Sequence, residues 1–200
     1  ILKKNNAVIS VFAGSRKSEL DVLTPIILDF IKLMNKKYDD FTFVFHSTKE
    51  YSSLIQTYIK KYNLNNCEVI SDNKIKSHIL KKSVFAVSKS GTVSLEICNA
   101  KIPSIIIYKM GIINFLLVKM LVKVKYANII NIAANDEIIP ELLQSNCNAK
   151  KIFEYVSDFL DNPQKINSQI KKTQLIINNL KTEKLSSAQA AIALNNFLNK

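Results

Sequence analysis

Residues 84–96 read VFAVSKSGTVSLE, and this stretch contains the passage from a buried strand to a helix. The apolar run 84–88 predicts a short strand, and the helix after the turn is expected to continue through Asn99. The turn holds Gly91, one of only three glycines in the 200-residue chain, between two hydroxyl side chains. A glycine in so glycine-poor a sequence is expected where the backbone turns sharply or where a ligand comes close to it. The stretch therefore predicts a strand–turn–helix unit with a ligand at its turn.

The same alternation of short apolar runs and helical segments continues on both sides of this unit. Helices are predicted at 20–37, 49–62 and around 75–82. Such alternation is typical of a parallel sheet covered on both faces, so we expect an α/β fold with a Rossmann-like doubly wound parallel sheet. The other predicted strands are 7–13, 41–46, 67–71 and 103–108, with a sixth strand or extended segment at 127–132.

Prolines mark the limits of two helical segments. Pro25 lies within 20–37 and, because proline lacks the N–H of a helical hydrogen bond, it is expected only near the start of that helix. From Pro140 the chain is expected to be helical to its end, with breaks at 161–163 and near 182–184. The predicted fold therefore carries a helical C-terminal tail.

The composition is that of a folded protein of a reducing compartment. Hydrophobic residues make up 48% of the chain and charged residues 22%, as in globular domains. Cys67, Cys98 and Cys147 are odd in number and far apart, which argues against disulfides and fits the cytoplasm. Two histidines without a Cys-x-x-Cys pair argue against a zinc site, so no metal is expected. No uncharged span reaches transmembrane length, so no membrane-spanning helix is predicted.

The formal charge of +12 raises the question of an anionic partner. Of the 28 basic residues only Arg16 is arginine, whereas proteins that read bases and phosphates usually favour arginine for its planar fork. The lysines are also spread through every segment instead of forming one stripe. These features argue against nucleic-acid binding and favour a solvated lysine surface, with attraction to an anionic membrane surface as the alternative.

In doubly wound sheets, ligands bind beyond the carboxyl ends of the strands, and a first informative loop lies there. It follows the strand 7–13 and reads AGSRKSE. Gly14 permits a tight turn, and Ser15 and Arg16 are able to meet an anionic oxygen. The structural alternative is that Gly-Ser-Arg forms only a turn. We interpret the loop as a candidate anion site.

A second loop places Ser90, Gly91 and Thr92 where the next helix begins. Free backbone N–H groups at a helix start bind phosphate readily, and glycine allows close approach. Glu96, one helical turn further on, is expected to accept hydrogen bonds from ribose hydroxyls. The structural alternatives are an N-cap and a carboxylate favoured by the helix dipole. Neither a Walker A motif nor G-x-G-x-x-G is present, so the two loops predict a diphosphate site of another kind.

Five motifs along the chain together resemble a known family, lipid-A-disaccharide synthase, a GT-B glycosyltransferase of bacterial outer-membrane synthesis. The match covers the C-terminal half of such an enzyme, and the chain start, with neither methionine nor signal peptide, is expected to follow an N-terminal half. The resemblance implies a UDP-sugar donor-binding domain at 1–160, with helices at 161–200 packing on it or on that other half. The motifs, in order, are GSRKSE (14–19), SGTVSLE (90–96), IIIYK (105–109), VKVKYANIIN (122–131) and PELLQ (140–144).

The resemblance implies transfer of 2,3-diacylglucosamine from UDP-2,3-diacylglucosamine to 2,3-diacylglucosamine 1-phosphate. The transfer inverts the anomeric centre and uses no metal and no cofactor. The implied location is cytoplasmic and peripheral at the inner membrane, with no nucleic-acid partner and with a homodimer left open. A helix predicted at 113–126, apolar but interrupted by lysines, is expected either in the core or at a surface near the acyl chains.

Site residues carry over from the family by motif, and Arg16 is implied to stabilise the charge on the donor diphosphate. Two departures from the family pattern are Ala13, where proline is expected, and the two isoleucines before Asn131, where Leu-Pro is expected. The general base is expected in the N-terminal half, because neither His46 at a strand end nor His78 in a lysine-flanked helix replaces it. The residues implied to bind the donor are Gly14, Ser15, Arg16, Ser90, Gly91, Thr92, Glu96, Asn131 and Gln144.

Three other classes of function remain open at this point. A related GT-B enzyme with undecaprenyl-linked acceptors, or a UDP-sugar epimerase, would share the diphosphate site. A non-catalytic UDP-sugar-binding subunit paired with a separate acceptor subunit would share it too. A basic nucleic-acid-binding module is the least favoured, because the positive charge is almost entirely lysine.

Overall fold

The computed structural model describes residues 7–111, 125–180 and 186–198. Its strands form one sheet in the order β3-β2-β1-β4-β5-β6, and every neighbouring pair is parallel. With the first strand beside the fourth, this is the doubly wound arrangement that the sequence predicts. The strands are β1 (Ala7–Phe12), β2 (Phe41–His46), β3 (Cys67–Ile70), β4 (Ser83–Lys89), β5 (Ser104–Tyr108) and β6 (Glu141–Leu143).

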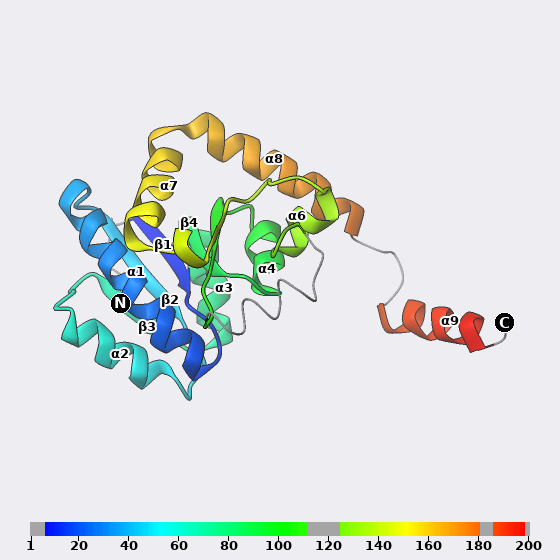
Figure 1. Cartoon of the computed structure of the whole chain (residues 1–200), viewed down its shortest axis with the longest axis horizontal. Helices are drawn as coiled ribbons and strands as arrows, with labels where there is room; N and C mark the ends of the chain where they lie inside the picture. The colour runs from blue at the N-terminus through cyan, green and yellow to red at the C-terminus, as the bar shows by residue number, and fades with distance from the viewer. Residues whose placement is uncertain (1–6, 112–124, 181–185, 199–200) are drawn as a thin grey trace.

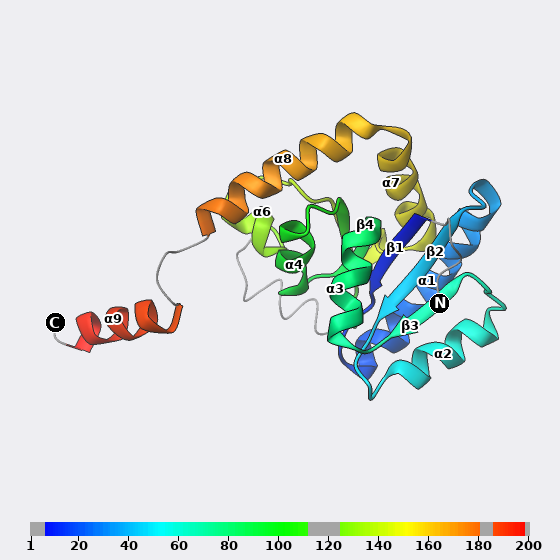
Figure 2. The same cartoon turned by 180° about the vertical axis from the view of Figure 1, so that it is seen from behind.

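Helices cover both faces of the sheet, as Figures 1 and 2 show from opposite sides. They are α1 (Lys17–Lys37), α2 (Ser52–Lys61), α3 (Asn73–Lys82), α4 (Val93–Asn99), α6 (Ile129–Ala134), α7 (Ala149–Asp161), α8 (Pro163–Leu180) and α9 (Ser186–Leu198), with a 3₁₀ turn η1 (Gln144–Asn146). α1, α2 and α7 pack on one face, and α3, α4 and α6 pack on the other together with α8.

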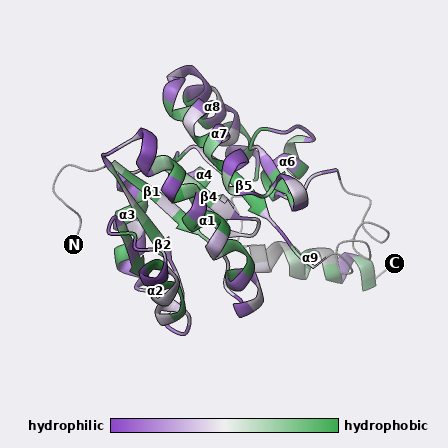
Figure 3. Cartoon of the chain, turned by 60° about the vertical axis from the view of Figure 1, so that its left-hand side comes forward, coloured by the Kyte–Doolittle hydropathy of each residue, from purple (hydrophilic) through white to green (hydrophobic). Residues whose placement is uncertain are grey.

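The sheet is buried on both faces because its strands are almost wholly apolar. Ile9 of β1 lies in register with Phe43 of β2 and with Phe85 of β4, and all three are fully buried. Phe43 packs edge-on against Phe30 of α1, with ring centres 5.9 Å apart. Burial of each such side chain contributes about 1.5–3 kcal/mol. Figure 3 shows the hydrophobic colour along the central strands and hydrophilic residues on the helices around them. The packed sheet is a firm base for the loops at its carboxyl edge.

The segment 127–132 forms the start of α6 from Ile129, so the prediction of a strand there is wrong. α6 begins after Asn128, whose side chain accepts a hydrogen bond from the Ile130 N–H at 2.9 Å. The carboxylate of Glu141 accepts the N–H groups of Ala127 and Asn128 at 2.7 and 2.9 Å. These acceptors satisfy N–H groups that a helix start leaves free, so the apolar residues that follow coil instead of joining the sheet.

The sixth strand is β6, which lies in a segment predicted to be helical, so that prediction is also wrong. Its Leu142 pairs with Ile107 of β5 and is buried. Three residues are too few to show the alternation of a strand in the sequence, and the pairing with β5 decides their conformation. Beyond β6 the described residues form η1 and the helices α7, α8 and α9, as predicted, and the predicted break at 161–163 is confirmed, since α7 ends at Asp161 and α8 begins at Pro163.

Pro25 lies in the interior of α1, contrary to the prediction that it would stand near the helix start. α1 begins at Lys17, earlier than expected, so about two helical turns precede the proline. Pro25 cannot donate to the carbonyl of Asp21, which costs the helix one hydrogen bond. Leu23 and Ile27 are both buried on either side of it, so packing against the sheet outweighs this local loss.

Two predictions concern parts of the chain that the structure describes only partly or not at all. The helix predicted at 113–126 falls almost entirely outside the described residues, and Lys125 and Tyr126 are not helical. The helix break predicted near 182–184 also lies outside them.

The C-terminal helices differ in their packing. α8 packs against α4 and α6, whereas α9 stands apart from the rest in both views (Figures 1 and 2). No helix of the described ranges is both long enough and apolar enough to cross a membrane. The division of the chain at residue 160 stays a prediction. The large apolar side chains that α9 exposes are Ile192, Leu194, Phe197 and Leu198.

Candidate functional site

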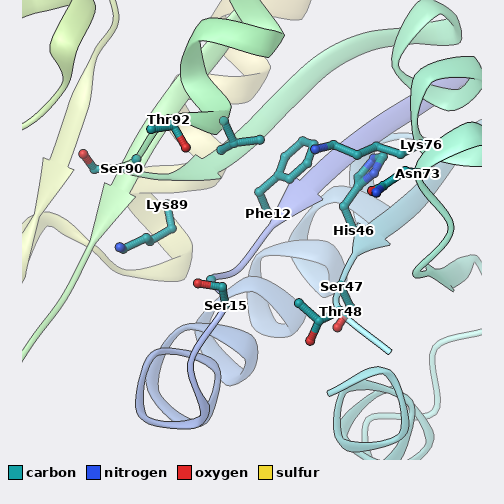
Figure 4. A pocket seen from close by; sticks show the side chains of 13 residues that line it. Phe12, Ser15, His46, Ser47, Thr48, Asn73, Lys76, Lys89, Ser90 and Thr92 are labelled. Carbon is teal, nitrogen blue, oxygen red and sulfur yellow. The ribbon is translucent and has the colours of Figure 1, made fainter. Parts of the chain in front are cut away.

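The carboxyl ends of β1 and β4 lie side by side where the strand order reverses, and a pocket of about 310 Å³ opens there (Figure 4). It brings together residues of both predicted anion loops. The predicted residues Arg16, Glu96, Asn131 and Gln144 do not line it. The lining residues are Phe12, Gly14, Ser15, His46, Ser47, Thr48, Asn73, Lys76, Lys89, Ser90, Gly91, Thr92 and Val93.

Gly14 has a specific structural reason to be glycine. Its φ is +128°, a region that L-residues rarely adopt, and a Cβ there would lie 2.6 Å from Oε2 of Glu19. The same Oε2 accepts a hydrogen bond from the Ser15 N–H at 3.1 Å. Glu19 therefore folds back under the loop after β1 and holds it in place.

Arg16 directly precedes α1 in an extended conformation and follows Ser15 of the pocket wall, but it does not line the pocket itself. Its side chain is 79% exposed, and Nη1 lies 3.7 Å from Oε1 of Glu19. A pair this long and this exposed contributes less than about 1 kcal/mol, so the guanidinium is not tied to the folded chain.

The turn after β4 lines the pocket with Ser90, Gly91 and Thr92, the residues of the second predicted anion loop. The Ser90 hydroxyl donates to the carbonyl of Ala127 at 2.7 Å, which ties the turn to the start of α6. Within the described part of the chain, the N–H groups of Gly91 and Thr92 have no hydrogen-bond acceptor. A Cβ on Gly91 would meet no atom within 4 Å, so the protein itself does not require glycine there. Gly91 and Thr92 both line the pocket, so the open space and the free N–H groups belong to residues that border it.

The structure pairs Glu96 with a neighbour instead of placing it in the pocket wall. Its Oε2 lies 2.7 Å from Nζ of Lys76, and its side chain is 53% exposed. Gln144 begins η1 at the carboxyl end of β6, with φ of +50°. It is separated from the pocket by β5, so the sheet does not bring it to the two loops.

Asn131 is fully buried in α6, and both atoms of its amide are used within the fold. Its Oδ1 accepts the N–H groups of Ile138 and Ile139 at 3.0 and 2.9 Å. Its Nδ2 donates to the Ile139 carbonyl at 2.7 Å and to Oε1 of Glu141 at 2.8 Å. These bonds hold the turn that leads into β6, and they leave little capacity for a ligand.

Sequence reasoning missed several polar residues of the pocket wall. These are Asn73 and Lys76 opposite the two loops, and Lys89 between the loops. His46 ends β2, as predicted, and its ring stacks on Phe12 with centres 4.2 Å apart. A polar residue at the end of an apolar strand was a signal for His46, because strand ends in this fold face the ligand. The lysines carried no comparable signal in a sequence with lysine throughout.

A chain of hydrogen bonds decides which ring nitrogen of His46 carries the proton. The Ser83 hydroxyl donates to the carbonyl of Ile79, so it accepts from Ser10 at 2.7 Å. Ser10 in turn accepts from Nε2 of His46 at 2.8 Å, which leaves Nδ1 as a lone-pair acceptor without a partner among the described residues. Burial, and secondarily the charge of Lys76, lower the pKa of His46 to about 3, so the ring is neutral at physiological pH.

The geometry can be compared with known proteins. A solved C-terminal domain of a group 1 glycosyl transferase from Francisella tularensis has a TM-score of 0.59 at 14% identity, covering 89% of this chain and 87% of that one. A UDP-GlcNAc 2-epimerase from Neisseria meningitidis, solved with UDP-GlcNAc, has a TM-score of 0.56 at 15% identity, covering 89% of this chain and 44% of that one. At these identities the likeness concerns the fold, which is that of the C-terminal domain of GT-B glycosyltransferases.

Relatives found by sequence have a higher identity to this chain than the two solved structures above. The lipid-A-disaccharide synthase of Rickettsia prowazekii (strain Madrid E) is 33% identical over 180 residues, which cover 90% of this chain and 47% of the relative. The chain thus spans about half the length of that relative. A family model described as lipid-A-disaccharide synthetase matches residues 1–195. With this match along nearly its whole length and the sheet order of a GT-B domain, the chain belongs to the lipid-A-disaccharide synthase family.

Proposed function

We propose that the pocket binds the UDP part of a UDP-sugar, and that the chain is the donor-binding half of a lipid-A-disaccharide synthase. The observation that carries this proposal is the convergence of two separately predicted anion loops on one pocket. The pocket wall contains two lysines and, among the described residues, no carboxylate. A cationic hollow at the switch point of a doubly wound sheet suits a nucleoside diphosphate.

The proposed roles follow the placement of the residues. The loop Gly14–Ser15 and the turn Ser90–Gly91–Thr92 face the diphosphate, and the free N–H groups of the turn donate hydrogen bonds to its oxygens. Arg16 reaches the diphosphate from beside Ser15, where its exposed fork is free to turn inward. Glu96 holds the ribose after release from its lysine partner. A donor contact of Gln144 rests on the family motif alone, because its position beyond β5 keeps it away from the two loops. For Asn131 we propose a structural role, since its amide is already bonded.

The proposed reaction is the inverting transfer of 2,3-diacylglucosamine from UDP-2,3-diacylglucosamine to 2,3-diacylglucosamine 1-phosphate. We propose that the acceptor site and the general base lie outside these residues. His46 is an unsuitable base for the acceptor hydroxyl, because a pKa of about 3 makes it a very weak one. The exposed apolar residues of α9 and the lysine-rich surface are consistent with a cytoplasmic protein bound peripherally at the inner membrane.

Calorimetric titration with UDP, UMP and uridine tests the donor site. We expect saturable binding that weakens in that order, because each lost phosphate removes contacts with the cationic pocket. Transfer assays on the whole protein that contains these residues, with acylated and unacylated UDP-sugars, test the reaction. Equal turnover of both donors would favour a related UDP-sugar enzyme, and absence of UDP binding would overturn the proposal.

A further inference from the structure

Lys89 occupies the junction of the two anion loops. It is the last residue of β4, directly before the turn at Ser90, and its side chain is 22% exposed. Its Nζ lies 3.2 Å from Oε1 of Glu19, beneath the loop after β1, and 5.3 Å from the ring centre of Tyr108. Figure 4 shows Lys89 between Ser15 and the turn that carries Ser90. The ammonium group of Lys89 therefore contacts the residue that holds the first loop, while its backbone leads directly into the second.

Among the described cations, Lys89 is the best placed to meet an anion at this end of the pocket. Arg16 is exposed and does not line the pocket. Lys76 lines the opposite side, where Glu96 holds its Nζ at 2.7 Å and the ring centre of Phe12 lies at 5.7 Å. An ammonium has three N–H donors, and Glu19 takes one of those of Lys89, which leaves two for a ligand.

Glu19 keeps this cation in place before a ligand arrives. Its side chain is only 14% exposed, and burial by itself would raise its pKa. The Ser15 N–H and the ammonium of Lys89 outweigh that effect and lower the pKa, so the carboxylate stays charged at neutral pH. A lysine already fixed by an ionised partner loses little side-chain freedom when it binds a ligand.

We propose that Lys89 binds the phosphate oxygens of the nucleoside diphosphate, and that it is the principal cation of the pocket for the ground-state donor. The inference rests on the proposed function of the pocket as a UDP-sugar site. It assigns the diphosphate to the end formed by Gly14, Ser15 and the turn 90–92. The nucleoside is thereby directed toward the aromatic wall of Phe12 and His46.

The test compares Lys89→Met, Lys89→Arg and a matched control, Lys151→Met, by calorimetric titration with UDP, UMP and uridine. Lys151 also pairs with a carboxylate, Glu154 at 3.0 Å, but lies on α7 outside the pocket. We expect Lys89→Met to weaken UDP roughly 10- to 100-fold, the range of a charge-assisted hydrogen bond, and UMP less. Uridine binding should be unchanged, Lys89→Arg should stay within about threefold for UDP, and the control should match the wild type.

The outcomes separate the two proposals. If the wild-type protein binds no UDP, the proposed function fails. If it binds UDP but Lys89→Met stays within twofold, or loses UDP and uridine equally, the assignment of Lys89 fails while the pocket function stands. Circular dichroism and thermal unfolding check the fold of each variant. If Lys89→Met does not fold, Lys89→Gln takes its place in the same titrations.

Discussion

The carboxylate of Glu96 lies 2.7 Å from the ammonium of Lys76, and this ion pair joins α4 to α3 across the side of the pocket. The partner that lines the pocket is Lys76, not Glu96. A ribose bound here either shares the carboxylate of Glu96 with the lysine, through Oε1, or draws Glu96 away from it. Both side chains are accessible to water, so the exchange costs little.

We expect Glu96→Gln to weaken UDP about tenfold and to remove the preference for UDP over 2′-deoxy-UDP, because the amide is a weaker acceptor for a ribose hydroxyl than the carboxylate. Titration of both nucleotides into wild type and variant measures the effect. A variant that weakens both nucleotides equally would show that Glu96 acts only through Lys76.

Arg16→Lys should reduce kcat/KM roughly 100-fold in the whole protein that contains these residues. Lysine keeps the charge but loses the planar fork that donates two parallel hydrogen bonds to phosphate oxygens. Charge grows on the leaving diphosphate as the glycosidic bond breaks, so the loss should fall on kcat as well as on binding. Steady-state kinetics at saturating and low donor concentration measure it. Activity within threefold of wild type would show that Arg16 does not bind the diphosphate.

Gly14→Ala should affect mainly the stability of the fold, whereas Gly91→Ala should affect mainly the binding of UDP. Gly14→Ala should lower the free energy of unfolding by about 2 kcal/mol, because its φ is strained for alanine and the new Cβ meets Glu19. Gly91→Ala should leave stability within about 0.5 kcal/mol but weaken UDP, because its Cβ enters open space beside the pocket. Urea unfolding and UDP titration on both variants test the pair. A stable Gly14→Ala protein would contradict the role given to Glu19.

Asn131→Ala should destabilise the fold by about 3 kcal/mol, because the N–H groups of Ile138 and Ile139 lose their buried acceptor. Urea unfolding at pH 7 measures the loss. Gln144→Ala is the comparison, since this half-buried side chain should affect stability much less. If the Asn131→Ala protein had normal stability but no longer bound UDP, Asn131 would contact the donor directly and would not have the structural role proposed here.

His46 should make the protein sensitive to acid. Burial holds its folded pKa at about 3, against 6.5 for the ordinary group, so between these values the unfolded chain binds a proton that the folded chain does not. Stability is therefore fully present above pH 6.5 and is lost as the pH falls toward 3, by up to about 1.4 kcal/mol per pH unit. Between pH 7 and 4.5, wild type should lose about 2 kcal/mol more than His46→Gln by urea unfolding. Parallel losses in both proteins would place the sensitivity elsewhere.

The local pattern of the sequence was sufficient to predict the fold class and the positions of the two loops. Strands 41–46 and 84–88 are apolar on both faces because each lies inside a covered parallel sheet, and that requirement is visible in a few consecutive residues. The turn at Gly14 is likewise local, since only glycine adopts its backbone angle easily. Parallel strands then bring the loops that follow them to one edge, so a shared site at 14–15 and 90–92 followed from the order of elements.

Contacts between residues distant in the sequence decided the conformation of two segments and the surroundings of Lys89. Residues 141–143 became a strand because β5 offered hydrogen bonds. Residues 129–134 became a helix because Asn128 caps its start and Glu141 accepts the N–H groups of Ala127 and Asn128 before it. The role of Lys89 depends on its place in the pocket wall and on Glu19, which the fold brings within 3.2 Å of it.

His46 differs from an ordinary strand-end histidine through burial and through its hydrogen bond to Ser10. Charge, protonation and hydrogen-bond capacity at the site depend on which groups exclude water and on which partners they meet. Those relations join residues tens of positions apart, and no local pattern of the sequence contains them.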